Sequence, residues 1–297
     1  MTSWTPDDLL KLDLKYAKEG IPHHQRPLKA ALELLGTAFS IGMIGNPEVE
    51  KIMAAYAAAV PEVDTTWPGM GIGIAASSDQ VRKVTLPIMA GGGAPIEAWS
   101  GLGFSSDADW WNWCRKDLDI AAETSFAFAD LHDFAYGLDS LQHGNPEALT
   151  LLQMAQSNLE DVANTLPATF SVNSVIQPIC LVAELALKGA LVWEGADPKS
   201  FKGSKGHNLT LLASQMATAR PHRDDALVSL VISRLPPYVD SRYRPAGLTR
   251  LQVVRRALGV QFIAASALRR IAGPDLAAQM ETGGWPAPQR PFFPDEA

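Results

Sequence analysis

The chain has 297 residues, of which 47% are hydrophobic and 19% are charged, and its formal net charge is −7. This length and composition suffice for one large or two medium domains with a sizeable buried core, which excludes an intrinsically disordered protein. The acidity argues against a general nucleic-acid coat protein, because phosphates are bound by clustered Lys and Arg. Local basic runs do occur in the C-terminal half, at Arg250, Arg255–Arg256 and Arg269–Arg270.

Cysteine usage and apolar runs indicate the compartment. Cys114 and Cys180 are the only cysteines. A single disulfide between two such distant cysteines could not stabilise a chain of this size, which favours a reducing compartment. No Cys/His cluster has metal-ligand spacing, so we expect neither a metal nor another cofactor. The N-terminus lacks the features of a signal peptide, and Gly, Pro or charge interrupts the longest apolar stretches. We therefore expect a cytoplasmic protein that does not enter a membrane.

Start and stop signals along the chain predict a mainly α-helical fold. Thr5-Pro6-Asp7-Asp8 combines a capping hydroxyl, a proline in the first turn and two acids, and predicts a helix over about residues 5–19. Similar signals and apolar spacing predict further helices over about 28–41, 49–59, 106 to 137 or 144, 145–166, 172–193, 209–218, 224–234 and 249–272.

The stretch from Pro61 to Phe104 differs from the rest because it is dense in Gly and Pro. Residues 72–75 and 81–89 have the character of short strands, so the stretch forms either an irregular loop or a small β-hairpin. Its glycines do not match a phosphate-binding loop, and a flexible lid or tight packing explains them better. We predict an N-terminal helical region over 1–105, a helical bundle over 106–275 with its core at about 145–275, and an extended Pro-rich tail over 276–297.

Two segments of the C-terminal half carry a family resemblance. The helix segment Ala183–Trp193 contains Glu184 and Lys188, a favourable i,i+4 pair, and is followed by Lys205-Gly-His-Asn-Leu209. This pattern resembles the HEPN family, whose members carry Glu-Leu-x-Leu-Lys-x-x-Leu and then Gly-His-Asp/Asn-Leu. The resemblance implies a bundle of four to five helices and a homodimer that pairs through it. It covers roughly the last half of the chain.

The RNase motif of many HEPN proteins is absent from this sequence. That motif needs an Arg, four to six intervening residues and a His, so that the His acts as acid or base while the Arg steadies phosphate charge. No His of the chain has an Arg at that distance, and Lys202 before His207 is the nearest approximation. Lys lacks the bidentate fork of Arg. An RNase of the usual HEPN type is therefore not expected.

The candidate binding residues lie in the same half of the chain. His207, with Lys205, either faces a pocket between helices or serves as a helix cap and core hydrogen-bond partner, and we favour the second interpretation. A second candidate group is Arg242, Tyr243 and Arg244. Either its arginines bind a phosphate while Tyr243 stacks on a base, or the group forms a solvated turn after two prolines, and we again favour the second interpretation.

Other chemistry-bearing residues give weaker signals. Asp130, His132 and Asp133 have acid–base or metal-ligand character, but nothing in the sequence supports them as a site. Trp110, Trp111 and Trp113 cannot all face one core at helical spacing, so a partner or domain contact is expected.

Three hypotheses for function follow. The first is a non-catalytic module that binds a nucleotide, RNA or a protein through a basic patch around Arg242, Arg244 and Arg255. The second is an enzyme with its active site in the Gly-rich middle or between the two halves, which predicts a deep pocket with polar groups near residues 69–93. The third is a structural assembly protein.

Overall fold

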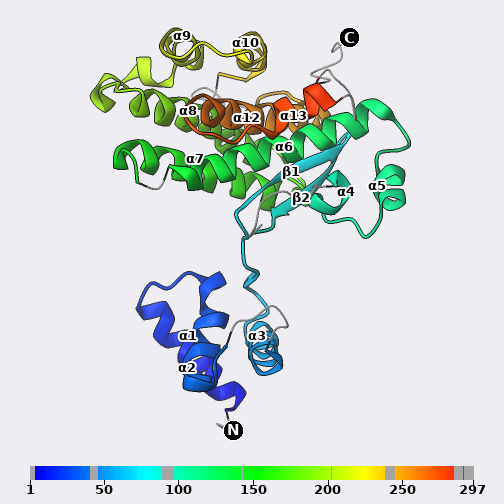
Figure 1. Cartoon of the computed structure of the whole chain (residues 1–297), viewed down its shortest axis with the longest axis vertical. Helices are drawn as coiled ribbons and strands as arrows, with labels where there is room; N and C mark the ends of the chain where they lie inside the picture. Colours follow the sequence, from blue (N-terminus) through cyan, green and yellow to red (C-terminus); the bar gives the residue numbers. More distant parts are fainter. Residues whose placement is uncertain are drawn as a thin grey trace. The chain divides into compact units, whose positions relative to one another are not determined.

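The computed structural model describes residues 4–40, 46–88, 97–141, 143–201, 203–237, 245–283 and 290, with only the backbone of Ser204 and Lys205. The chain divides into two compact units, Met1–Pro68 and Gly69–Ala297. Arg242, Tyr243 and Arg244 lie outside the described residues. The predicted mainly helical fold with a short β segment is confirmed (Figure 1).

The N-terminal unit is a three-helix arrangement of α1 (Pro6–Lys18), α2 (Arg26–Leu35) and α3 (Pro47–Ala59). Thr5 and Asp8 form the capping box that starts α1, and Asn46 caps α3. Asp13 accepts hydrogen bonds from Arg26 and from the Tyr56 hydroxyl, at 2.9 and 2.6 Å, and so ties all three helices together. The hydrophobic core of the N-terminal unit consists of the buried residues Leu9, Tyr16, Ala30, Ala31, Val49, Ile52 and Tyr56.

The second unit is a helical bundle with one hairpin packed on it. Its long helices are α6 (Leu118–Ser140), α7 (Pro146–Thr165), α8 (Ile176–Trp193) and α12 (Arg250–Ile271), and α8 packs on both α7 and α12 while α12 also packs on α6. The shorter helices are α4 (Ala98–Gly101), α5 (Asp107–Trp113), α9 (Leu209–Ala219), α10 (Asp225–Arg234) and α13 (Leu276–Gly283). Val172–Trp193 is long and apolar enough to cross a membrane, but 83% of its most apolar window is buried inside the protein, as in a core helix.

One predicted helical stretch is divided. Residues after Ser106 form α5 and α6 instead of one continuous helix, because Arg115 and Lys116 between them both have positive φ angles, which end a right-handed helix. The three tryptophans, of which at least one is expected at an exposed or interfacial position, all contact the core: Trp110 is buried, and Trp111 and Trp113 are half-buried against it.

The Gly-rich stretch contains the hairpin that the sequence left open as an alternative. Strands β1 (Gly71–Ser77) and β2 (Gln80–Leu86) pair antiparallel, with Gly71 opposite Leu86. Every residue of β1 is buried, and the strand packs on α6 and α7 (Figure 1). A Cβ atom on Gly73 would lie 2.5 Å from Gln261 Oε1, so only glycine allows this approach. The tight-packing interpretation is therefore correct at Gly73, whereas glycines 91–93 lie outside the described residues.

On the edge of β1 away from β2, a side chain of α12 pairs the backbone groups of Ile74. The Gln261 side chain accepts a hydrogen bond from Ile74 N at 2.9 Å and donates to Ile74 O at 3.0 Å and to Ala127 O at 2.7 Å. Buried peptide groups must be paired, and Gln261 supplies the partner that a third strand would otherwise provide. This pairing helps β1 to lie buried in the unit, whereas β2 is mostly half-buried or exposed.

Two boundaries differ from those predicted. The division between units falls after Pro68 instead of near residue 105, because the hairpin belongs to the second core through α6, α7 and Gln261. The tail predicted to be extended from residue 276 begins with a helix, α13. Asp133 accepts hydrogen bonds from the Leu276 and Ala277 amides, at 2.7 and 3.2 Å, and so satisfies the free amides of its first turn.

Replacing Gln261 with Leu should destabilise the second unit strongly. The substitution leaves the Ile74 N–H and C=O buried without their partner, at a cost of about 1–3 kcal/mol for each unsatisfied group. We expect urea unfolding to show a loss of at least about 2 kcal/mol. Gln279→Leu, at an exposed position of α13, is the matched control and should change stability by less than about 0.5 kcal/mol. Equal effects of the two substitutions would contradict the role given to Gln261.

Candidate functional site

His207 lies against a buried acidic residue of α8. Its Nδ1 is 3.1 Å from Glu184 Oε2, and the Lys188 ammonium donates to Glu184 Oε1 at 2.6 Å. Glu184 is 3% exposed, whereas the His207 side chain is 44% exposed. The ring is therefore anchored at Nδ1 by the core carboxylate and reaches the surface, which agrees with its interpretation as a core hydrogen-bond partner.

The residues that flank His207 have structural roles of their own. A Cβ atom on Gly206 would lie 1.8 Å from the Phe201 carbonyl oxygen, so glycine is required there. Asn208, not His207, caps α9 by accepting the Leu211 amide hydrogen at 3.0 Å. The Gly-His-Asn motif thus brings the loop onto α8 and starts the next helix. The structure describes only the backbone of Lys205, so its role as a binding residue beside His207 stays a prediction.

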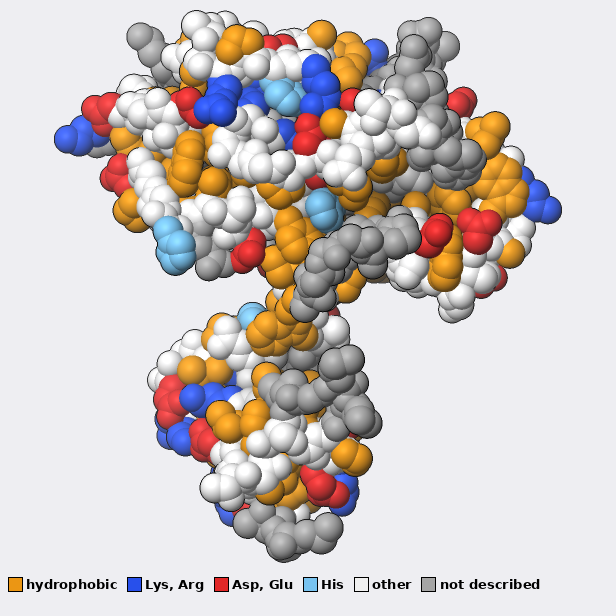
Figure 2. All heavy atoms as spheres, in the orientation of Figure 1, with side chains coloured by type: hydrophobic (Ala, Val, Ile, Leu, Met, Phe, Trp, Pro, Cys, Tyr) orange, Lys and Arg blue, Asp and Glu red, His pale blue; other side chains and the backbone are white. Residues whose placement is uncertain are grey.

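Most of the described arginines in the basic runs of the C-terminal half form hydrogen bonds to backbone oxygens within the protein. Arg256 and Arg270 are 6% and 5% exposed, and they donate to the backbone oxygens of Arg234 and Arg220. Arg250 donates to the carbonyls of Asp79, Leu166 and Pro167. On the face seen in Figure 2, the described Lys and Arg side chains are interspersed with acidic ones. These arginines therefore do not form the basic face that nucleic-acid binding requires.

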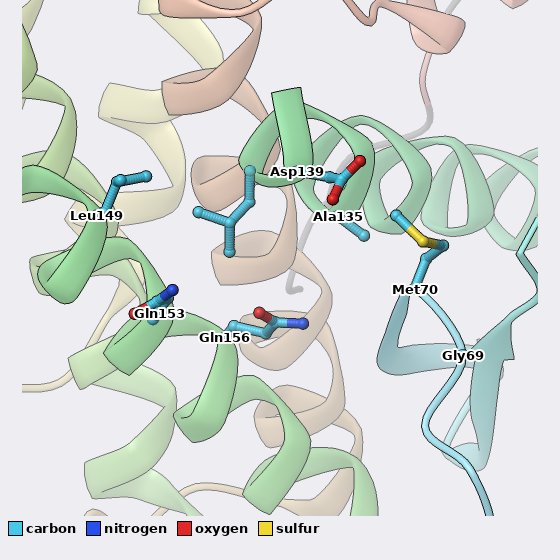
Figure 3. A pocket seen from close by; sticks show the side chains of 8 residues that line it. Gly69, Met70, Ala135, Asp139, Leu149, Gln153 and Gln156 are labelled. Carbon is cyan, nitrogen blue, oxygen red and sulfur yellow. The ribbon is translucent and has the colours of Figure 1, made fainter. Parts of the chain in front are cut away.

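A cavity of about 430 Å³ opens between α6, α7 and the start of β1 (Figure 3). This volume falls within the range of small-molecule sites. The described residues that line it are Gly69, Met70, Ala135, Leu138, Asp139, Leu149, Gln153 and Gln156. It agrees with one expectation of the enzyme hypothesis, a pocket with polar groups near residue 69.

Spacing and close packing bring the polar groups of this cavity together. Gln153 follows Leu149 by four positions, and Gln156 follows Gln153 by three. At this helical spacing the three side chains share one face of α7. Across the cavity, Gly69 has a φ of 62°, and a Cβ there would lie 2.1 Å from the Leu86 carbonyl oxygen. Glycine at this position lets the chain turn into β1 beside the cavity, where Met70 forms an apolar wall (Figure 3).

The lining of the cavity favours binding over catalysis. Asp139 is the only titratable side chain among its eight described residues, and none of them is a Ser, Cys, His or Lys. No hydrogen bond joins the Gln153 or Gln156 side-chain amide to another described residue. Each amide offers both donors and an acceptor, which makes these two side chains suited to recognising a polar ligand.

The most heavily charged part of the unit is a buried cluster around Arg269. Its guanidinium lies 2.6 Å from Asp130, 2.7 Å from Asp133, 3.4 Å from Asp224 and 3.5 Å from Asp275. The Arg269 side chain is 0% exposed. The cluster joins α6, α12 and the starts of α10 and α13. The acid pair noted in the sequence is therefore structural, and its partner lies far along the chain.

Further charged side chains complete this cluster. Arg223 makes two hydrogen bonds to Asp275, at 2.6 and 2.8 Å, and one to Glu281 at 3.0 Å. Two histidines contact its acids, with His132 Nδ1 3.0 Å from Asp133 and His222 Nδ1 3.3 Å from Asp224. We find no group of His, Cys, Asp and Glu arranged to hold a metal ion among the described residues.

Glu123 on α6 is a titratable group that the sequence analysis missed. Burial raises the pKa of its carboxyl to about 7, although the positive charge of Arg255 opposes the shift. No hydrogen bond to this carboxyl comes from the part of the chain that the structure describes. A carboxyl that titrates near neutral pH has the property of a general acid or base. The shift depends on packing, so residue spacing gives no signal for it.

The thiols offer no reactive group. Both cysteines are buried, burial raises the pKa of Cys114, and burial together with the charge of Glu184 raises the pKa of Cys180 to about 12. Both side chains therefore stay protonated at neutral pH.

Comparison with known proteins adds no relative. No protein-family model, no curated protein and no solved structure matches the chain.

The cluster around Arg269 should make stability fall steeply in acid. Burial opposes ionisation of Asp133, Asp224 and Asp275, yet hydrogen bonds and the charge of Arg269 hold the pKa of each below its usual value of 3.8. Carboxyls with lowered pKa values stabilise the fold above the unfolded pKa, and this contribution is lost as the pH falls through the folded pKa. Urea unfolding at pH 7, 4 and 3 should therefore show a progressive loss below pH 4.

Asp224→Asn tests the origin of that loss, and Asp119→Asn in an exposed position of α6 is its control. The first substitution should lower stability at pH 7 and flatten the acid dependence, whereas the second should do neither. An unchanged acid dependence in Asp224→Asn would be inconsistent with the prediction.

Glu123→Gln should have the opposite pH dependence. The folded carboxyl binds its proton more tightly than the unfolded one, because its pKa is about 7 against the ordinary 4.5. Its contribution to stability is therefore lost as the pH rises from 4.5 through 7. The substitution should stabilise the protein at pH 8 by up to about 3 kcal/mol and have little effect at pH 4. A constant difference between the two proteins from pH 4 to pH 8 would refute the raised pKa.

Proposed function

We propose that the second unit is a HEPN-like, non-catalytic binding module whose ligand occupies the cavity between α6, α7 and β1. The observation that carries this proposal is the pair of glutamine amides, Gln153 and Gln156, on one wall of a cavity of about 430 Å³. The sequence pattern around Glu184 and His207 supports the HEPN-like classification. A cytoplasmic location and a homodimer belong to the same proposal.

The chemistry of the lining favours a nucleoside-sized, uncharged heterocycle. Glutamine amides pair edge-on with the donor and acceptor groups of a base, while Met70 and Leu138 supply apolar surface for a ring. The carboxylate of Asp139 and the lack of any cationic residue among the described lining side chains disfavour a phosphate in the cavity. Within the nucleotide class expected from the sequence, the geometry therefore favours the nucleoside over its phosphate esters.

A second candidate is nucleotide or RNA binding at His207. The ring is 44% exposed and is anchored to Glu184 beside the Lys188 ammonium, so it presents an oriented polar group at the surface. Arg242, Tyr243 and Arg244, which lie outside the described residues, are candidates for the same site on their residue types. Buried arginines of α12 supply no phosphate contacts, so this candidate has less support.

Calorimetric titration of the full chain with adenosine, guanosine, cytidine and uridine and their 5′-monophosphates tests both candidates. We expect at least one nucleoside to bind and its monophosphate to bind about tenfold more weakly or not at all, because a charge repulsion of about 1.4 kcal/mol gives that factor. Gln156→Leu should weaken nucleoside binding by about tenfold, the loss expected for one or two hydrogen bonds.

Two further variants give the controls. Gln279→Leu, in an exposed position outside the cavity, should bind as the unmodified chain does. His207→Ala should also leave nucleoside affinity unchanged. Tighter binding of monophosphates, lost in His207→Ala and kept in Gln156→Leu, would instead support the second candidate, and no binding of any nucleoside would refute the first.

A further inference from the structure

The guanidinium of Arg290, near the end of the chain, occupies a slot on α6 and α12. It makes a two-pronged contact with Asp130, at 2.5 Å from Nη1 to Oδ2 and 2.9 Å from Nη2 to Oδ1. The guanidinium carbon lies 4.5 Å from the centre of the Phe126 ring and 4.8 Å from that of Phe262. The Arg290 side chain is only 5% exposed.

The groups that form this slot are held by the core of the unit. Phe126, Asp130 and Phe262 are 1%, 2% and 0% exposed. Asp130 Oδ1 also accepts a hydrogen bond from Arg269 Nη2 at 2.6 Å, which fixes the carboxylate from within the core. A planar guanidinium between a bidentate carboxylate and two aromatic rings is the geometry in which Arg is preferred to Lys, because the fork and the flat face are both used. The slot is thus built for an arginine side chain.

Charge balance explains why the slot requires a cation. The cluster around Arg269 contains the carboxylates of Asp130, Asp133, Asp224 and Asp275, with Glu281 at its edge. Arg269 and Arg223 are its other guanidinium groups among the described residues. Without Arg290, the carboxylates of the cluster would outnumber its guanidinium groups by a wider margin. Buried charge that has no opposite charge beside it destabilises the fold.

We propose that Phe126, Asp130 and Phe262 form an arginine-binding site that Arg290 fills in cis and that accepts a peptide arginine supplied in trans. The link between Arg290 and the end of α13 at Gly283 is short, so the tethered arginine competes at a high effective concentration. An arginine supplied in trans must therefore displace Arg290 before it can bind. The inference is independent of the cavity between α6, α7 and β1.

Chemical rescue of the full-length Arg290→Ala variant tests the site. The probe is N-acetyl-arginine amide, which represents a peptide arginine, and the readout is the thermal unfolding midpoint. The substitution should lower the Tm by about 5 °C or more, as expected for the loss of a buried charge partner. Millimolar N-acetyl-arginine amide should recover most of that loss, because a ligand that binds only the folded state raises its stability.

Matched probes and variants make the outcome specific. N-acetyl-citrulline amide, which has a similar shape without the charge, and N-acetyl-lysine amide, which has the charge without the fork, should not rescue Arg290→Ala. The unmodified chain and Arg220→Ala, which removes a surface arginine paired with Glu194, should not respond to any of the three probes.

Three results would overturn the proposal. They are an unchanged Tm in Arg290→Ala, no rescue by the arginine probe, and equal rescue by all three probes. If Arg290→Ala does not fold, Arg290→Lys carries the same test, because it keeps the charge and loses the fork. Its Tm should then rise with the arginine probe and not with the lysine probe, and the absence of that difference would equally refute the site.

Discussion

The burial of one guanidinium, that of Arg269, constrains the arrangement of the second unit. A charged group removed from water is tolerated only when opposite charges and hydrogen bonds replace its hydration. The partners of Arg269 come from α6, from the residue before α10 and from the start of α13, while the arginine itself belongs to α12. All four elements must be in place at once for the charge to be neutralised. Asp133 illustrates the coupling, because the same carboxylate pairs with Arg269 and caps α13.

Helix positions could be predicted largely because their signals are local. Thr5, Asn46, Asn145 and Thr249 each cap the helix that follows, and in each case a backbone amide within three residues is the donor. The hairpin could not be decided on the same grounds. Its burial depends on Gln261, which lies 187 residues from Ile74. Tertiary contacts of that kind leave no pattern in the strand itself, and the domain boundary was misplaced for the same reason.

The candidate sites also differ in whether their signal is local in the sequence or depends on tertiary contacts. His207 stood out in the sequence through its neighbours, and the structure accounts for it by the contact with Glu184. Gln153 and Gln156 carry no reactive chemistry and lie in an ordinary amphipathic helix, so only the packing of α7 beside α6 and Met70 gives them a cavity. Asp130 and Asp133 were visible as an acid pair, but Arg269 is 136 residues from Asp133. Residue type alone could not separate a structural ion cluster from a metal or acid–base site.

The contact between Gln261 and Ile74 also limits how molecules of this protein associate. An open strand edge is a template on which another chain can add, and it is a frequent start of aggregation. At Ile74 the amide and carbonyl of β1 are already occupied by Gln261 from within the same chain. Extension of the sheet on the β1 side would require this side chain to withdraw from the core. Growth into a larger intermolecular sheet is therefore blocked on that side for as long as α12 remains in place.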